Sequence, residues 1–135
     1  MSTVLRVYGE HFRVHEVLPT CPLKPDSVSI KGQPRDSDAA QVHALSGFNL
    51  CVSVLDWEPF EAQIDDSREF IAEHEDWLRS LRRRPDIDTL ILDFGVLQGE
   101  RAGTLNLFVS PSFSGLLSEL GITMEISLYP PTGSG

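Results

Sequence analysis

The most constraining feature of the sequence is its closing segment, where a helical pattern is followed almost directly by a strand pattern. Residues 114–120 place apolar side chains at helical spacing, and the next residue, Gly121, is of the type that commonly ends a helix. From Ile122 onward, apolar and other side chains alternate, which is typical of a strand with one buried face. The side chains that we expect in the core are Ile122, Met124, Ile126 and Leu128.

Similar patterns upstream predict the fold class. The expected strands cover 48–55, 89–97, 104–110 and 122–129. One long helix is expected to begin at an Asp66 N-cap and end at Pro85, and a second to begin near Pro111. The resulting order, strand, helix, strand, strand, helix, strand, is the ferredoxin-like βαββαβ pattern. We therefore predict an α+β fold, an antiparallel sheet of four to six strands with two main helices on one face.

A further strand and a short helix precede this core. Thr3 to Tyr8 alternates as a strand does, and Phe12 to Leu18 is expected to form a short helix. We expect this unit to extend the sheet at an edge, the alternative being one curved antiparallel sheet wrapped on the long helix. The segment 19–41 contains four prolines and predicts a long functional or mobile loop. We expect one domain over residues 1–130 and a flexible tail at 131–135.

The charge of the chain narrows the classes of partner. Its formal net charge is -9, which disfavours nucleic acid and anionic membranes, because both require a basic surface. The same charge suits a basic protein partner. We see neither a signal peptide nor an apolar run of about 20 residues that could span a membrane, so we expect a cytoplasmic protein. Cys21 and Cys51 are expected as free thiols there, although the sequence leaves their pairing open.

No residue set has the pattern of a catalytic or metal site. His11 and His15 are spaced to share a helix face, but the sequence offers no defined third ligand. Cys51 has no histidine nearby in sequence to act as its base. Asp93 is more informative, since a charge within an apolar strand requires a partner or water. We expect no cofactor, no metal and no catalytic residue, and the sequence favours a binding protein over an enzyme.

The face of the sheet opposite the helices is the expected recognition surface. On this face we expect isolated aromatic side chains among short polar groups, a composition suited to protein recognition. The candidate partner-binding residues are Tyr8, Asp93, Phe108, Glu125 and Tyr129.

Several short segments also support a resemblance. They are 18–20 (LPT), 30–34 (IKGQP), 120–122 (LGI) and 125–129 (EISLY). With this layout, the chain resembles a bacterial domain-of-unknown-function family of small single-domain proteins. The resemblance implies an α+β fold and a cytoplasmic setting, and no activity or site residues. More loosely, the chain is similar in type to immunity proteins that neutralise bacterial toxins.

These observations favour a non-enzymatic protein-binding domain. The more specific hypothesis is an immunity protein that binds a basic cognate toxin. One alternative is a small-molecule binder or enzyme with a pocket between the 19–41 loop and the sheet. Another is a homodimeric structural subunit that associates through a sheet edge. The sequence leaves open whether the chain is a monomer or a homodimer.

Overall fold

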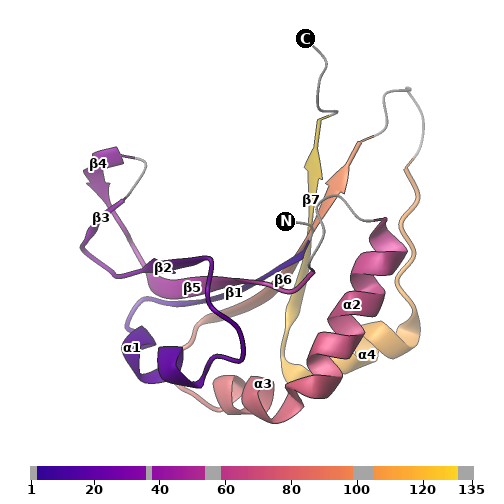
Figure 1. Cartoon of the computed structure of the whole chain (residues 1–135), viewed down its shortest axis with the longest axis horizontal. Coiled ribbons are helices and arrows are strands. Elements are labelled where there is room, and N and C mark those ends of the chain that lie inside the picture. Colours follow the sequence, from indigo (N-terminus) through magenta and orange to yellow (C-terminus); the bar gives the residue numbers. More distant parts are fainter. Residues whose placement is uncertain (1–2, 36–37, 54–58, 99–104, 131–135) are drawn as a thin grey trace.

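The computed structural model describes residues 3–35, 38–53, 59–98 and 105–130 (Figure 1). These residues form a five-stranded sheet, a two-stranded hairpin and a layer of helices. The order in the larger sheet is β2 (Ser27–Ser29), β5 (Ser46–Cys51), β1 (Thr3–Gly9), β6 (Thr89–Leu97) and β7 (Thr123–Tyr129). The hairpin consists of β3 (Pro34–Arg35) and β4 (Asp38–Val42). The helices are α1 (Val14–Val17), the 3-10 turn η1 (Leu18–Thr20), α2 (Phe60–Glu73), α3 (Glu75–Arg82) and α4 (Pro111–Leu120).

The larger sheet has one face covered by helices and one face free of them. In β1, Leu5 and Val7 are buried in the core, whereas the alternating Arg6 and Tyr8 point to the other side and are half-buried. Figure 1 shows α1 and α3 beneath the sheet and α2 and α4 beside its β6–β7 half. One apolar cluster unites the strands with these helices, and its members include Val7, Phe48, Leu78, Leu92 and Leu117. The predicted α+β class and the helices on one face are confirmed.

The order of the strands differs from the ferredoxin-like prediction. β1 is the central strand and pairs antiparallel with both β5 and β6, so it is not an extension at an edge. Residues 105–110 form no strand, and β7 lies beside β6 and runs parallel to it. Leu107 and Val109 instead pack, half-buried, against the core. The helix α4 supplies the crossover that a parallel pair of strands requires.

The long helix also begins earlier than predicted and is divided. α2 starts at Phe60, which is buried with Ile64, so Asp66 is an interior helical residue and not the N-cap. The backbone of His74 leaves the helical region, with φ -122 and ψ 27, and separates α2 from α3. Helical hydrogen bonds nevertheless flank the break, because Leu78 N donates to His74 O and His74 N donates to Phe70 O, both at 3.0 Å. Phe70 and Ile71 are buried before the break and Leu78 and Leu81 after it, so one apolar stripe continues across the two helices.

The turn between α4 and β7 confirms the predicted stop at Gly121. This residue has φ 69, in the left-handed region that favours glycine. Gly121 N donates to Ser118 O at 3.1 Å and Ile122 N donates to Leu117 O at 2.9 Å, the pattern of a Schellman cap. This cap lets the chain reverse from helix into strand without a linker.

The prediction that all four apolar side chains of the last strand lie in the core is wrong for two of them. Ile122 is buried and Met124 is half-buried, but Ile126 is 38% exposed and Leu128 is 50% exposed. Figure 1 shows β7 running well beyond the end of α4, and β7 is an edge strand of the sheet. The alternation of side chains is therefore correct, whereas the helix layer is too short to cover the whole strand.

The 19–41 segment is less irregular than a plain loop. Within it, β2 pairs antiparallel with β5, and β3 begins the hairpin that projects from the sheet on the side away from α1 (Figure 1). The predicted tail at 131–135 lies outside the described residues, as do residues 54–55 of the strand expected at 48–55.

Candidate functional site

A hydrogen-bonded row of polar side chains crosses the helix-free face from one edge of the sheet to the other. This polar row takes one residue from each strand, in the order Ser127 (β7), Asp93 (β6), Arg6 (β1), Asn49 (β5) and Ser27 (β2). Ser127 Oγ donates to Asp93 Oδ1 at 2.7 Å, and Arg6 Nη2 donates to Asp93 Oδ2 at 3.0 Å. Arg6 Nη1 donates to Asn49 Oδ1 at 3.3 Å. Asn49 Nδ2 donates to Ser27 Oγ at 2.9 Å. Each side chain of the row is therefore held in place by its neighbours.

Asp93 is the most buried member of the polar row. It is 4% exposed, and its carboxylate accepts two hydrogen bonds from Arg6, one from Nε at 3.3 Å and one from Nη2. The hydroxyl of Ser127 supplies a third. The expectation that a charge in this strand requires a partner is confirmed, and the partner is a cation from the adjacent central strand.

Tyr8 occupies its place on the face because the residue opposite it has no side chain. Gly47 is the partner of Tyr8 in the β1–β5 register. A Cβ atom on Gly47 would meet the Tyr8 ring and the carbonyl oxygen of Val7. The ring therefore packs over the glycine, and Tyr8 Oη donates to Asn49 Oδ1 at 3.0 Å, which joins it to the polar row.

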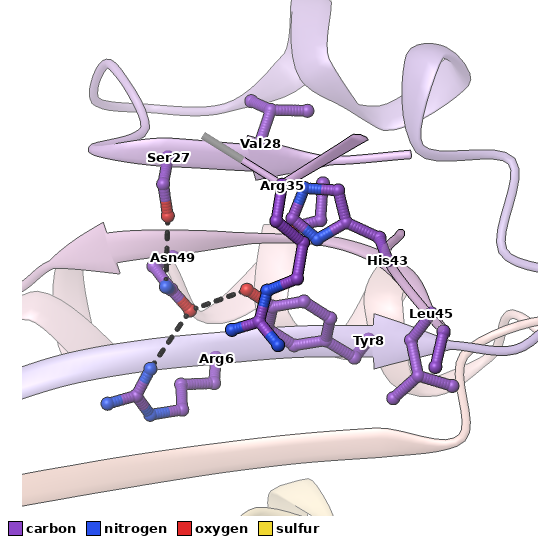
Figure 2. A pocket seen from close by; sticks show the side chains of 10 residues that line it. Arg6, Tyr8, Ser27, Val28, Arg35, His43, Leu45 and Asn49 are labelled. Atoms are coloured by element: carbon purple, nitrogen blue, oxygen red, sulfur yellow. Dashed lines mark hydrogen bonds between the residues drawn. The ribbon is translucent and has the colours of Figure 1, made fainter. Parts of the chain in front are cut away.

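A pocket of about 490 Å³ opens at the β2–β5 end of this face (Figure 2). Its floor comes from Arg6, Tyr8 and Asn49, and its overhanging wall includes Arg35 of β3 and His43 after β4. Figure 2 shows Arg35 reaching from the hairpin toward Tyr8, with the His43 imidazole beside it. The pocket thus lies between the sheet and the end of the 19–41 segment.

Backbone hydrogen bonds fix the base of the overhanging hairpin. His43 N donates to Gln33 O, and Gly32 N donates to His43 O, both at 2.9 Å. Gly32 has φ 86, a conformation that favours glycine, which lets the chain turn from β2 into the hairpin. Lys31 N donates to Ser46 Oγ at 2.9 Å and ties this turn to the start of β5. These bonds connect the wall of the pocket to its floor.

Four of the five candidate residues share one face of the sheet, but Tyr8 and Tyr129 lie beside opposite ends of β6, next to Thr89 and Leu97. Strand alternation places Tyr8, Asp93, Glu125 and Tyr129 on the helix-free face, where Glu125 and Tyr129 are exposed and Asp93 is covered. Phe108 is 78% exposed, but it lies in the non-strand segment 105–110 and not in a strand of this face. Its assignment to the face by strand alternation is wrong, because that strand does not form.

Sequence reasoning did not identify the cationic wall of the pocket. Arg35 and His43 lie in and beside a hairpin without strong apolar alternation, so no periodic signal assigns them to a face. Arg6 could have been found from Asp93, since a buried acid in one strand implies a cation on a neighbouring strand. The pairing of β1 with β6, which joins them, is a long-range feature that the local pattern does not contain.

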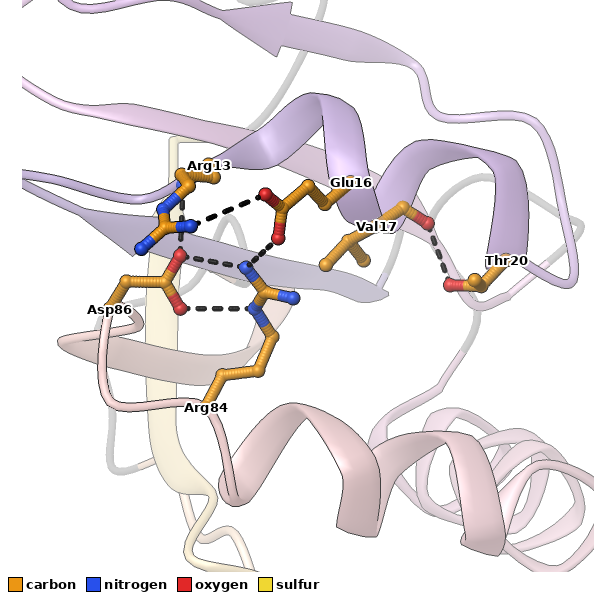
Figure 3. Close-up of polar contacts among 6 residues, drawn as sticks. All are labelled: Arg13, Glu16, Val17, Thr20, Arg84 and Asp86. Carbon is orange, nitrogen blue, oxygen red and sulfur yellow. Dashed lines mark hydrogen bonds and ion pairs between the residues drawn. The ribbon is translucent and has the colours of Figure 1, made fainter.

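A second charged cluster lies among α1, the end of α3 and the start of β6 (Figure 3). Arg84 donates to both carboxylate oxygens of Asp86, at 3.0 and 2.8 Å, and to Glu16 Oε1 at 3.0 Å. Asp86 Oδ2 also accepts from the backbone N–H of Arg13 at 2.9 Å. The Arg84 guanidinium lowers the pKa of Asp86 from 3.8 to about 2, and it also lowers the pKa of Glu16. All these groups are paired internally, so the cluster holds α1 in place and is not a binding site.

The residues considered for metal or thiol chemistry form no such site. Among residues 3–35, 38–53, 59–98 and 105–130, no group of three or more His, Cys, Asp or Glu side chains could hold a metal ion. The side chain of His11 lies 4.0 Å from that of Glu10 and is largely exposed. Cys21 and Cys51 are not joined by a disulfide, and Cys51 Sγ donates to Ser53 O at 2.8 Å. Burial raises the pKa of Cys21, which makes it less reactive.

Comparison with known proteins gives one match. A family model described as "Domain of unknown function (DUF4279)" matches residues 1–131. The chain belongs to the DUF4279 family. No curated protein and no solved structure matches this DUF4279 chain. The resemblance to a domain-of-unknown-function family is therefore confirmed, whereas similarity to immunity proteins remains a prediction. No helix in the described part of the DUF4279 chain is long and apolar enough to cross a membrane.

Proposed function

We propose that this DUF4279 chain is a non-enzymatic protein-binding domain whose binding surface is the helix-free face of the sheet. The observation that carries the proposal is the polar row, which fixes donors and acceptors across all five strands of the sheet before a partner arrives. Groups held in this way lose little conformational entropy on binding. The exposed ring of Tyr129 and the half-buried ring of Tyr8 add aromatic anchors to the same face.

The state of Asp93 supports binding over acid–base catalysis. Its carboxylate accepts three hydrogen bonds and is paired with Arg6, so it is held as a structural anion beneath the surface. A general base needs a carboxylate that can reach a substrate proton. The polar groups that remain accessible on the face are suited to hydrogen bonding with a partner.

The charge of the chain supports a basic partner. A net charge of -9 produces a field that speeds the approach of a cationic protein and makes the encounter dependent on salt. The specific form of the proposal is an immunity protein that binds a basic bacterial toxin. This form predicts a toxin gene beside the gene for this chain, and rescue of cells that express the toxin.

The test measures affinity by isothermal titration with the purified product of that neighbouring gene. The double variant E125A/Y129A changes two exposed residues of the helix-free face. The control L23A/E69A removes an exposed apolar residue and one negative charge on the side of the helices, where both line a different pocket. We expect E125A/Y129A to weaken binding at least tenfold and the control to change it less than twofold.

Two results would count against the proposal. The first concerns the binding surface and the second concerns the immunity role. Equal affinity of both variants and the parent would place the binding surface elsewhere on the molecule. A neighbouring gene product that neither binds the chain nor harms cells would remove the immunity role.

A small-molecule-binding function is the second candidate, and the pocket favours it. A volume of about 490 Å³ is within the range of ligand pockets. The pocket lies between the sheet and residues 27–35, in the region where this alternative requires a pocket.

A further inference from the structure

We infer that the pocket between the sheet and the β3–β4 hairpin is a site for an oxyanion, the carboxylate or phosphate group of a small organic anion. This inference is independent of the proposed protein-binding role. It follows from the side chains of the pocket, from their charge and from how they are held.

The charge of the lining is opposite to that of the whole molecule. The chain carries nearly twice as many acidic as basic residues, 20 against 11, yet the described residues that line the pocket include Arg6, Arg35 and His43 and no Asp or Glu. With this composition, an average patch of the surface would contain more acidic than basic side chains. A cationic pocket on an acidic protein concentrates anions at one place and repels them elsewhere.

Arg35 is the main source of this charge. Within the described part of the chain, its side chain makes no ion pair and no hydrogen bond, unlike Arg79 and Arg84, which are each held by two carboxylates. Figure 2 shows its guanidinium close to the Tyr8 ring, although the residue is exposed. A guanidinium presents paired N–H donors that match the oxygens of a carboxylate or phosphate.

The floor of the pocket is rigid and keeps donors available. Asp93 holds Arg6 through Nε and Nη2, and Asn49 holds it through Nη1, so the guanidinium has one orientation. Only part of its donor capacity is used by these bonds, because a guanidinium carries five N–H donors. Asp93 pairs with the Arg6 guanidinium beneath the pocket, so Arg35 supplies the positive charge that attracts an anion.

The same pocket offers a limited apolar surface. Leu45 is 40% exposed and lines it beside the Tyr8 ring, whereas the Val28 side chain points away from that ring (Figure 2). An anion with a small apolar or aromatic body would therefore contact Leu45 and the Tyr8 ring while its charged group meets the guanidinium of Arg35. The pocket volume accommodates a ligand of this size.

The experiment titrates the ¹⁵N-labelled full chain with three probes of similar shape at constant ionic strength. Benzoate and phenyl phosphate carry the two oxyanions, and benzamide is the neutral control. We expect saturable chemical-shift changes in the amides of Tyr8, Asn49 and Leu45 with at least one of the anions, and changes at least tenfold weaker with benzamide. The stronger anion identifies the preferred group.

A pair of matched variants separates the site from general charge. R35Q removes the central cation, and R83Q removes the exposed arginine that follows the last residue of α3, so both alter the net charge equally. We expect R35Q to raise the Kd of the anion at least tenfold and R83Q to leave it within twofold. Equal weakening by both variants, equal binding of benzamide, or the absence of localised shifts with either anion would overturn the inference. None of these outcomes depends on whether a protein partner exists.

Discussion

Arg6 Nη2 lies 3.0 Å from Asp93 Oδ2, and this ion pair joins the central strand β1 to its neighbour β6 beneath the helix-free face of the sheet. The Asp93 side chain is only 5% exposed, whereas that of Arg6 is 35% exposed. Asp93 is therefore the buried partner of the pair, and Arg6 is the partner that reaches the surface. This difference in burial determines how much stability each substitution is expected to remove.

Replacing Arg6 alone is expected to be strongly destabilising. R6L leaves Asp93 buried without its counter-ion, which costs about 3–5 kcal/mol of unfolding free energy. The double variant R6L/D93L removes the orphaned charge as well and is expected to recover at least half of that loss. Urea unfolding of the two variants and the parent measures both effects. A double variant no more stable than R6L would show that the pair does not act as a unit.

Gly47 is expected to control the position of Tyr8. G47A inserts a methyl group where the Tyr8 ring and the Val7 carbonyl oxygen lie, so the ring or the β1–β5 pairing must shift. We expect a loss of about 1–3 kcal/mol of stability, in the range of overpacking substitutions. The NMR chemical shifts of Tyr8 and Asn49 should also change in this variant. The control G115A, at a position with open space for a methyl group, should not be destabilising, because alanine favours the helix.

The pairing of Asp86 with Arg84 predicts a specific dependence of stability on pH. The pKa of Asp86 in the folded chain, about 2, is below its ordinary value of 3.8. A lowered pKa means that the carboxylate stabilises the fold fully at pH values above about 4, and that this contribution is lost as the pH falls toward 2. D86N lacks this contribution at every pH. We expect D86N to be about 2 kcal/mol less stable than the parent at pH 6, since hydrogen bonds to charged groups are lost.

Thermal unfolding between pH 2 and pH 6 provides the measurement for this pair. The difference between the parent and D86N should be constant near neutral pH and should shrink as the pH falls through the interval between the two pKa values. Substitution of an exposed acid on another element, D65N, serves as the control for general charge effects. A parent-to-D86N difference that does not change with pH would contradict the assignment.

The sequence predicted local features of this fold better than long-range ones. The cap at Gly121, the alternation in β1 and β7 and the apolar stripe over α2 and α3 depend on near neighbours, and all are present. The pairing of β1 at the centre of the sheet depends on residues far apart in the chain. The segment 105–110 shows the limit of such patterns, since Leu105, Leu107 and Val109 alternate as a strand would without forming one.

The same difference between local and long-range features applies to the candidate site. Asp93, Glu125 and Tyr129 were assigned to one face from alternation within their own strands, and the structure places them there. Arg35 and His43 reach the pocket only because a hairpin folds over the face, and no spacing in the sequence reports that folding. Residues on regular strands were predictable, and residues brought in by irregular connections were not.

The difference in exposure between Ile122, just before β7, and Leu128, near its end, predicts how substitutions at the two positions will differ. Leu128 is 50% exposed beyond the reach of α4, whereas Ile122 is 7% exposed beneath it. We expect L128A to cost less than about 1 kcal/mol and I122A to cost about 2–4 kcal/mol, because only the second leaves a cavity. Chemical denaturation of both variants tests this directly. A large loss in L128A would mean that its side chain is covered in solution, as it would be if β7 paired with a second copy of the chain at the sheet edge. Measuring the mass of the parent by light scattering at several concentrations would then decide between a monomer and a homodimer.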